Sequence, residues 1–346
     1  MFRKFIVLVS IFLSLLACKT EAKKTTSTVK KQVIKKTAVL SQNPKRKVGK
    51  NTTENAIKKA GEFADKLDFN LDYVRKKGLP DKKYLAEFLG MYLKLDKAAT
   101  SKKAKKALRK RVTPFYEKTR DPNFHNMAKV DDKLFKKNSM SYMRIMWLLN
   151  EMKFDISMYK KELAKVQPRM DKHMRIRGEW QRAVFDKYYD FFNIKKPAVL
   201  QNAKRLKGPI TTRKPITFYS RTNAYILTHF LFAAYDYGNK KTQSRFTKKD
   251  IVYLKEILPQ IIKKFEQKNN DDIVAELLTC LIFIEDTHTN SFTASYNRLL
   301  RRQNNDGSFG SYERVRKKYG SDIEFRTYMH TTLVALETLV EFEDRK

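Results

Sequence analysis

The sequence is poor in the two residues that make tight turns. Its 346 residues include 10 glycines and 9 prolines, whereas average usage would give about 24 and about 17. Folds built from many short strands need frequent turns, so this shortage argues against them. Long helices joined by short loops fit the composition better, and we expect an all-α protein.

Cysteine is nearly absent as well. Only Cys18 and Cys280 occur, which excludes a framework of several disulfides. Cys280 lies in the apolar run LLTCLIF, where an unpaired thiol behaves as a small hydrophobic group. We therefore expect Cys280 to be a buried core residue without a reactive role.

The N-terminal residues have the features of an export signal. Arg3 and Lys4 precede an apolar run, residues 5–16, that is too short to span a bilayer. The following LLAC resembles the lipobox of bacterial lipoproteins, in which the cysteine receives diacylglycerol and becomes the mature N-terminus. We expect a signal peptide over residues 1–17 and lipidation of Cys18. An ordinary secretory signal with a chance cysteine is the alternative.

Acidic residues are few beside basic ones, at 37 against 74, which gives a formal charge of +37. Such an excess is typical of nucleic-acid-binding proteins, but an export signal makes nucleic acid an improbable partner. We expect the membrane as a partner through Cys18, an anionic glycan or peptide as ligand, and a monomer. Lys19 argues against retention in the inner membrane, so we expect the outer membrane or surface of the bacterial cell envelope. Residues 18–53 predict a lysine-rich flexible tether.

Apolar residues recur at helical spacing from residue 54 onward. Amphipathic segments alternate with segments that are apolar around most of their surface, and the latter must be covered on every side. About six inner and six outer helices follow, which predicts an α/α toroid over residues 54–346; an open superhelical stack is the alternative. The predicted amphipathic helices are 54–77, 101–112, 155–167, 196–206, 247–267 and 291–303. The predicted apolar helices are 81–95, 139–153, 173–194, 217–237, 271–286 and 322–342.

A glycine-containing stretch near the C-terminus supports this fold. QNNDGSFG at residues 303–310, followed by the HTTLVAL helix, resembles the repeat of terpenoid cyclases and their relatives, which share an α/α toroid. That family usually has Trp where Phe309 stands. The resemblance implies a clasp at a helix end, with the aromatic ring packed beneath the next repeat and the glycines permitting left-handed backbone. An ordinary turn is the alternative.

A second resemblance covers roughly residues 139–342. NAYILTHFLFAAYDYG, DDIVAELL and YMHTTL resemble the Thr-His-x-x-Phe, Asp-x-x-x-Glu-Leu and Tyr-x-His-Thr-Thr helices of an uncharacterised family of bacterial toroid domains. It implies a fold and no reaction. The Asp-x-Asp-Asp motif of cyclases and the zinc-binding Asp-x-Cys pattern of prenyltransferases are absent, which argues against terpene and prenyl chemistry.

Three polar residues in the predicted inner helices are candidate catalytic groups. His229, Glu276 and His330 are separated by 47 and 54 residues, about one helix pair each, so a toroid places them on neighbouring inner helices. Two imidazoles and a carboxylate can bind zinc or act as acid and base; each histidine can also simply be hydrogen-bonded in the core. We assign them a catalytic role, assign no metal, and name no cofactor. Asp271 and Asp272 are interpreted as N-cap aspartates.

Aromatic and charged residues near the ends of the inner helices are candidate ligand contacts. Toroids of polysaccharide lyases and glycosidases line their clefts with Tyr, Arg and His, because rings stack on sugars and arginine forks hold carboxylates. A core aromatic stripe is the alternative. The predicted ligand-binding residues are Tyr219, Arg221, Tyr225, Asp236, Arg326 and Tyr328.

Three functions follow from these features. The first is an exported lipoprotein whose toroid binds an anionic glycan or peptide in a central cavity. The second is a polysaccharide lyase- or hydrolase-like enzyme that uses His229, Glu276 and His330. The third is a structural interaction module, because the fold does not choose among these functions.

Overall fold

All regular structure in the described part of the chain is helical, as the composition predicts. The computed structural model describes residues 52–66, 81–201, 207–310 and 329–345, which all belong to the unit formed by residues 48–346. Within these ranges there is no strand, and one isolated bridge joins Gln303 to Phe309. The protein is therefore all-α over its described residues.

Six of the described helices contact one another in a closed order. α3 contacts α5, α5 contacts α7, and the order continues through α9, α11 and α14 back to α3. We call these the inner helices. Every residue of α11 is buried, as expected for a helix covered on all sides. The inner helices are α3 (Asp81–Ala98), α5 (Asp132–Glu151), α7 (Glu179–Phe191), α9 (Arg221–Ala234), α11 (Asp271–Phe283) and α14 (Met329–Asp344).

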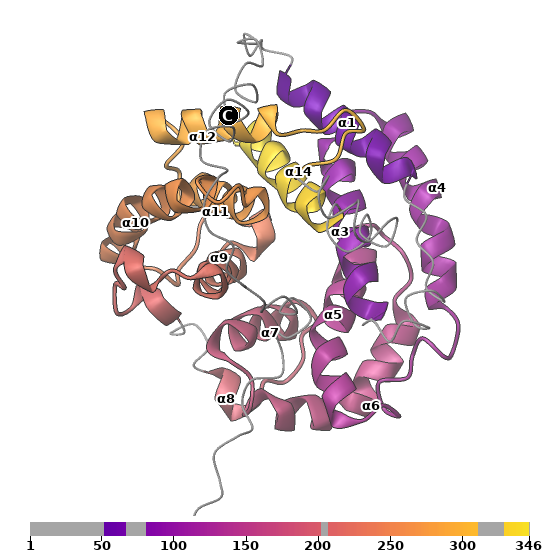
Figure 1. Ribbon diagram of the computed structural model, residues 1–346. Coiled ribbons are helices and arrows are strands. Elements are labelled where there is room, and N and C mark those ends of the chain that lie inside the picture. Colours follow the sequence, from indigo (N-terminus) through magenta and orange to yellow (C-terminus); the bar gives the residue numbers. More distant parts are fainter. Residues whose placement is uncertain (1–51, 67–80, 202–206, 311–328, 346) are drawn as a thin grey trace, which may run out of the picture. The chain divides into compact units, whose positions relative to one another are not determined.

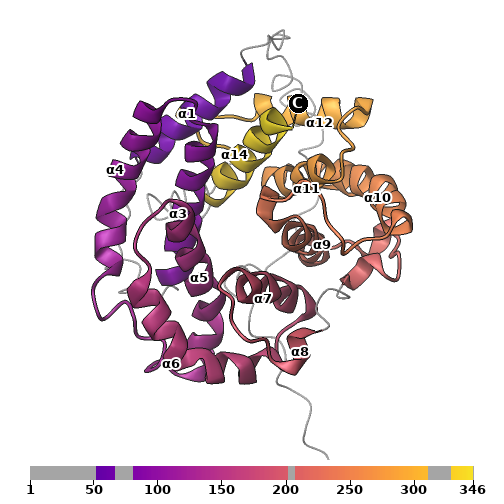
Figure 2. The same cartoon turned by 180° about the vertical axis from the view of Figure 1, so that it is seen from behind.

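The other described α-helices lie outside the inner helices (Figures 1 and 2). α12 is typical, because its buried residues follow helical spacing along one face. These outer helices are α1 (Thr52–Lys66), α4 (Lys102–Thr119), α6 (Ser157–Met174), α8 (Ala198–Gln201), α10 (Lys248–Glu266) and α12 (Asn290–Arg301). Short 3₁₀ turns lie between some helices: η2 (Gly208–Ile210), η3 (Ile216–Phe218) and η4 (Asp236–Gly238).

Several predicted helix boundaries are wrong; for example, α5 begins at Asp132 rather than at residue 139, and α6 ends at Met174 rather than at residue 167. The segment 101–112 was expected to end before Pro114, but α4 continues through this proline to Thr119. Pro114 and Lys110, whose carbonyl loses its helical partner, are both exposed, so water can satisfy that carbonyl. The predicted helix 173–194 is shorter in the structure, because α6 includes residues as far as Met174 and α7 spans only Glu179–Phe191.

Side-chain pairs show that four inner helices run in the same direction. Near their first turns, Tyr225 of α9 and His330 of α14 both bond to Asp272 of α11. Near their last turns, Lys94 of α3 bonds to Glu341 of α14. The N-terminal ends of α9, α11 and α14 therefore lie together, and so do the C-terminal ends of α3 and α14.

The stretch 303–310 is a clasp between three helices. The side-chain amide of Gln303 donates to the carbonyl of Ala56 in α1 at 2.8 Å. Phe309 is fully buried, and its N–H donates to the hydroxyl of Thr332 in α14 at 3.1 Å. Gly307 has a φ of 93°, and a Cβ there would lie 2.0 Å from a carbonyl oxygen of α1. The stretch thus ties the end of α12 to α1 and α14, as the sequence predicted.

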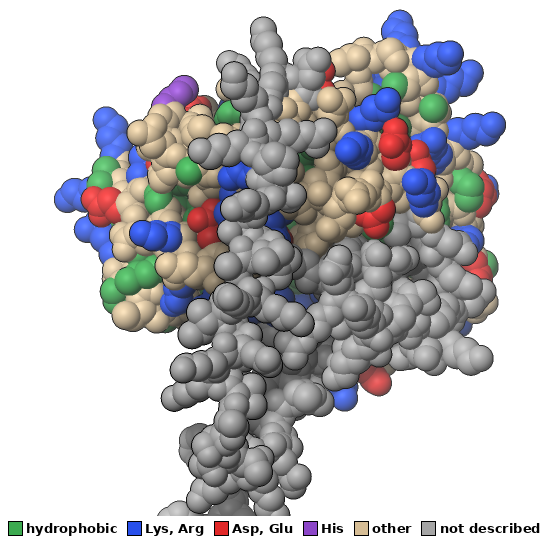
Figure 3. All heavy atoms as spheres, turned by 45° about the horizontal axis from the view of Figure 1, so that its top comes forward, with side chains coloured by type: hydrophobic (Ala, Val, Ile, Leu, Met, Phe, Trp, Pro, Cys, Tyr) green, Lys and Arg blue, Asp and Glu red, His purple; other side chains and the backbone are tan. Residues whose placement is uncertain are grey.

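Basic and acidic side chains are mixed on the described surface. Figure 3 shows one face, on which Lys and Arg side chains are spread over the described residues with Asp and Glu between them. Cys280 is buried and unpaired, as predicted. None of the described helices combines the length and the apolar character that crossing a bilayer requires. The predicted signal peptide, Cys18 and almost all of the tether lie outside the described residues.

Candidate functional site

The centre of the candidate site is an ion pair between α14 and α11. Nδ1 of His330 donates to Oδ1 of Asp272 at 2.7 Å. The His330 side chain is 30% exposed, and no described residue bonds to its Nε2. Burial by itself lowers the pKa of His330, but the carboxylate of Asp272 outweighs burial and raises that pKa to about 9. At neutral pH the imidazole is therefore a cation with a free N–H donor.

Asp272 was misinterpreted as an N-cap aspartate. The side chain of Asn270 caps α11, so the two aspartates that follow are free for other contacts. Asp271 turns outward to Arg298 and Arg302 of α12. Asp272 instead turns inward. A sequence pattern gives no signal for this difference, because both residues have the same type and lie in the same helical turn.

Further hydrogen bonds hold the carboxylate of Asp272 in place. The hydroxyl of Tyr225 donates to one oxygen and that of Thr331 to the other. Burial raises the pKa of Asp272, but the charge and hydrogen bond of His330, followed by the charge of Arg221 and the hydrogen bond of Thr331, outweigh burial and lower it below its ordinary value. Asp272 thus remains ionised and orients His330.

The second imidazole, His229 of α9, has the opposite character. Its Nδ1 lies 2.7 Å from the carbonyl oxygen of Tyr225, and since a carbonyl only accepts, the proton is on Nδ1. Its ring packs edge-on against Trp180, with centroids 4.7 Å apart. Burial, followed by the charges of Arg144 and His330, lowers the pKa of His229 to about 3. His229 is therefore neutral, and its Nε2 is an acceptor.

Glu276 lies one turn beyond Asp272 on α11 and is a neutral acid at physiological pH. It is 2% exposed, and the hydroxyl of Thr228 donates to its Oε2 at 2.5 Å. Burial and then the charge of Asp272 raise its pKa to about 8. Glu276 bonds to neither histidine, so the structure pairs His330 with Asp272 instead.

The opposite ends of the inner helices carry a different set of charges. Lys94 lies 3.0 Å from both Glu337 and Glu341 and also donates to the carbonyl of Tyr237. Gly238 has a φ of 89°, and a Cβ there would lie 2.0 Å from Oε1 of Glu341. The segment after α9 is therefore held closely against the end of α14.

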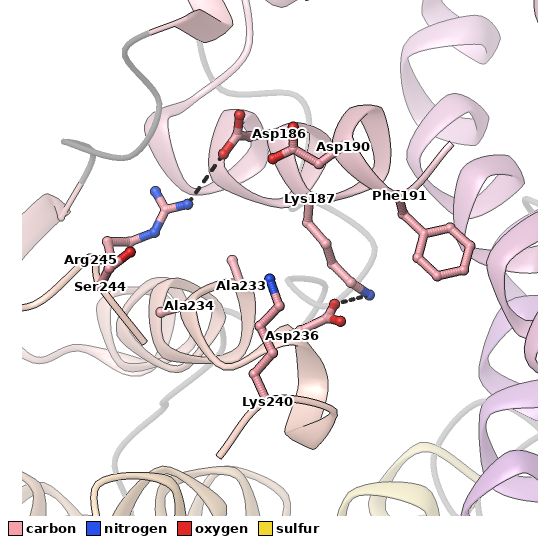
Figure 4. A pocket seen from close by; sticks show the side chains of 10 residues that line it. All are labelled: Asp186, Lys187, Asp190, Phe191, Ala233, Ala234, Asp236, Lys240, Ser244 and Arg245. Carbon is pink, nitrogen blue, oxygen red and sulfur yellow. Dashed lines mark hydrogen bonds and ion pairs between the residues drawn. The ribbon is translucent and has the colours of Figure 1, made fainter. Parts of the chain in front are cut away.

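A cavity of about 310 Å³ opens between α7 and the segment that follows α9. Figure 4 shows its side chains: Lys187 points toward Asp236, and Arg245 points toward Asp186. The Lys187–Asp236 distance is 3.0 Å, and that of Arg245–Asp186 is 3.4 Å. The lining residues are Asp186, Lys187, Asp190, Phe191, Ala233, Ala234, Asp236, Lys240, Ser244 and Arg245.

The ammonium group of Lys187 is enclosed by aromatic rings. It lies 3.6 Å from the ring centroid of Trp147, 4.8 Å from that of Tyr188 and 4.6 Å from that of Tyr237. Burial lowers the pKa of Lys187 to about 8, although Asp236 opposes the shift. The predicted ligand residue Asp236 thus already has a cationic partner.

The other predicted ligand residues are dispersed. Tyr219 is fully buried, and its hydroxyl lies 2.5 Å from that of Tyr253. Arg221 is exposed and lies over the ring of Tyr225 at 5.7 Å, close to Asp272. Arg326 and Tyr328 fall outside the described residues.

The predicted catalytic residues do lie on neighbouring helices. His229, Glu276 and His330 come from α9, α11 and α14, and α11 contacts both of the others. Among the described residues, no three His, Cys, Asp or Glu side chains are grouped to hold a metal ion. The site offers instead one charged donor, one neutral acceptor and one protonated carboxyl.

The helices that carry the candidate site lie in a segment that matches a known family model. Residues 195–339 match a domain of unknown function, DUF6895. The DUF6895 segment contains α9, α11 and α12 and most of α14, and hence all three predicted catalytic residues. No curated protein and no solved structure matches the chain. The match agrees with the predicted resemblance to an uncharacterised family and supplies no reaction.

Proposed function

We propose that the chain is an exported, lipid-anchored protein whose α/α toroid binds an anionic glycan or peptide among its inner helices. Lipidation of Cys18 would anchor it to the cell envelope. The closed order of contacts from α3 through α14 and back to α3 supports a toroid over an open stack, because an open stack leaves its first and last helices apart.

The observation that carries this function is the charged donor of His330. Its Nδ1 is bound to Asp272, while its Nε2 has no partner among the described residues. The N-terminal ends of α9, α11 and α14 lie at the same place, and helix N-termini favour anions. A partly exposed imidazolium beside three such ends suits an oxyanion.

The two tryptophans allow a test without a label. Trp180 packs on His229, and Trp147 lies near Tyr237, so both report on the interior. We expect oligogalacturonate or an acidic peptide to change the fluorescence of Trp180, with an affinity that falls as salt rises.

Variants identify the site. His330→Gln should weaken binding by about tenfold or more, whereas His288→Gln, at an exposed histidine, should bind as the unmodified chain does. Equal affinity of His330→Gln and the unmodified chain would contradict the proposed site. Galacturonate and peptide are compared in parallel, which identifies the ligand class.

A second candidate is acid–base catalysis, as in a polysaccharide lyase. His229 has an acceptor at Nε2 and His330 a donor, and pairs whose environments separate their pKa values assign base and acid. In an elimination, His229 takes the proton from the carbon next to a uronate carboxylate, and His330 protonates the leaving glycosidic oxygen. The low pKa of His229 makes it a weak base, and an anionic substrate raises that pKa.

Turnover separates the candidates. An enzyme should produce an unsaturated, ultraviolet-absorbing sugar from polygalacturonate, and His229→Gln should lose that product while still binding the polymer. A binding protein returns the polymer intact. A structural module neither binds nor cleaves it.

A further inference from the structure

Arg144 is a cation without a partner. It lies in α5 and is half-buried, and it forms no hydrogen bond or ion pair with any described residue. Its Nε is buried and unsatisfied. A guanidinium group is charged at every physiological pH and carries five N–H donors. Buried polar groups in folded proteins are nearly always bonded, so this one requires an explanation.

The surrounding residues make room for the guanidinium group. A Cβ at Gly90 of α3 would lie 3.1 Å from Nη2 of Arg144, so any side chain at position 90 would crowd it. On another side, the ring of Tyr237 lies 5.6 Å from the guanidinium carbon. Tyr237 has a positive φ of 51° and follows Asp236, whose φ is 52°. Such backbone is uncommon outside glycine, and strained positions of this kind cluster at ligand sites.

Several carboxylates of the inner helices and of the segment after α9 already have cationic partners. Each of five carboxylates has a cation within 4 Å, and the sixth carboxyl, Glu276, is protonated at neutral pH. None of these carboxylates is paired with Arg144, whose buried Nε has no partner among the described residues, as is also the case for Nε of Arg177 and Arg182. The pairs are Lys83–Glu87 at 3.7 Å, Lys94–Glu337 at 3.0 Å, Lys187–Asp236 at 3.0 Å, His330–Asp272 at 2.7 Å and Arg345–Glu341 at 3.6 Å.

Neighbouring carboxylates do not explain Arg144. Glu87 and Glu337 act on its charge at longer range, but neither is within 4 Å, and each is engaged by a lysine. Burial lowers the pKa of Arg144, but Tyr188 and Tyr237, followed by Glu337 and Glu87, outweigh burial and raise it. The guanidinium group therefore stays charged while its donors have no described partner. The planar fork of N–H groups is therefore available, and it matches two carboxylate oxygens at once.

We propose that Arg144 binds a carboxylate of the ligand through two parallel hydrogen bonds. This inference rests on the proposed function and deepens it, because it names the group that the interior recognises. Tyr237, whose ring lies beside the guanidinium group, forms one wall of the subsite, and Gly90 of α3 forms another. The carboxylate of a uronic acid residue and the carboxylate of a peptide present the same two oxygens.

Three variants of the full chain test the subsite. Arg144→Met removes the charge and keeps much of the volume. Gly90→Ala retains Arg144 but crowds its Nη2, while alanine favours the helix more than glycine does. Arg120→Met is the matched control, since Arg120 is exposed and pairs only with Glu117. Glucuronate is the probe, glucose is its neutral counterpart, and N-acetylglycine supplies a peptide-like carboxylate.

Affinity and melting temperature are measured together. We expect Arg144→Met to bind glucuronate about tenfold or more weakly, Gly90→Ala to bind it several-fold more weakly, and Arg120→Met to be unchanged. Neither interior variant should melt below the unmodified chain. The fluorescence of Trp147, near Tyr237, reports binding, and the stronger of the two carboxylate probes identifies the source.

The inference is overturned if Arg144→Met and Gly90→Ala bind glucuronate as tightly as the unmodified chain, if glucose binds equally well, or if no carboxylate binds. A separate arm does not depend on the natural ligand. Sulfate should raise the melting temperature of the unmodified chain more than that of Arg144→Met, and equal increases overturn the inference. Failure of the proposed function is recognised differently, because His330→Gln then binds normally while Arg144→Met does not.

Discussion

The two ends of the inner helices carry charges of different kinds. At the C-terminal ends, Lys94 is bound to Glu337 and Glu341. At the N-terminal ends, His330 keeps one nitrogen without a described partner, and Glu276 retains its proton. The first arrangement satisfies its charges within the protein, while the second leaves donors and acceptors available. We infer that the Lys94 cluster serves stability and that the His330 end serves recognition.

Helix dipoles account for part of this difference. Carboxylates are stabilised near helix N-termini and cations near C-termini, typically by 0.3–1 kcal/mol at low ionic strength, as an order of magnitude. Asp272 begins α11, and Lys94 lies in the last turns of α3. The dipole accounts for Asp272 and Lys94, but it opposes His330 at the start of α14 and Glu341 near its end, so their partners must hold these two charges.

Breaking the paired end should have the largest effect. Lys94→Met leaves Glu337 and Glu341 buried and short of their lysine. We expect a loss of about 3–5 kcal/mol in the free energy of unfolding, measured by urea titration. The control is Lys97→Met, at an exposed lysine three residues after Lys94. It should change the free energy of unfolding by less than about 0.5 kcal/mol. Similar losses in both variants would show that the paired end is not what stabilises the fold.

Glu276→Gln should sharpen the comparison through pH. The folded pKa of Glu276 is raised to about 8 from 4.5, so its contribution to stability is complete below the unfolded value and is lost as pH rises toward 8. Glutamine does not titrate and still accepts from Thr228. The stability of the variant relative to the unmodified chain should therefore increase as pH rises, by about 4 kcal/mol near pH 8. Parallel stability curves between pH 5 and 8 would contradict a buried protonated Glu276.

Asp272→Asn should change His330 more than it changes stability. Without the carboxylate, burial is unopposed, so the pKa of His330 should fall from about 9 to its ordinary value near 6.5 or below. Imidazole NMR signals report this, and the spectrum of His330→Gln assigns the resonance. The raised pKa of His330 stabilises the folded state fully at pH values below the pKa of an unfolded histidine, and this stabilisation is lost as pH rises through about 9. The stability of Asp272→Asn should therefore lack this change with pH. An unchanged titration of His330 in this variant would show that Asp272 does not raise its pKa.

The smallest effect on stability is expected at His229. Its Nε2 has no partner among the described residues, and its Nδ1 bonds only within its own helix and to the neighbouring Thr228. His229→Gln should therefore cost less than about 1 kcal/mol in urea unfolding, while any turnover of polygalacturonate falls. A loss as large as that of Lys94→Met would show that the imidazole is a core residue.

The sequence was sufficient for the helical class and for the alternation of apolar and amphipathic helices, because these depend on local spacing. The clasp at Phe309 was expected only from the resemblance of QNNDGSFG to a known repeat. The prediction from the sequence failed at Pro114, where exposure lets α4 continue. It also missed Asp272, Lys187 and Arg144. A single charged residue in an apolar helix has no local signature, and its role depends on the helices that pack around it.

The clasp and the contacts of α14 have a consequence for how the molecule is made. Gln303 bonds to Ala56, 247 positions earlier, and α14 packs on α1 and α3. Loops of this length close slowly, and α3 lacks its cover on one flank until the last helix is synthesised. The fold is therefore completed only after α14 has been synthesised, when both α1 and α3 gain their last neighbour.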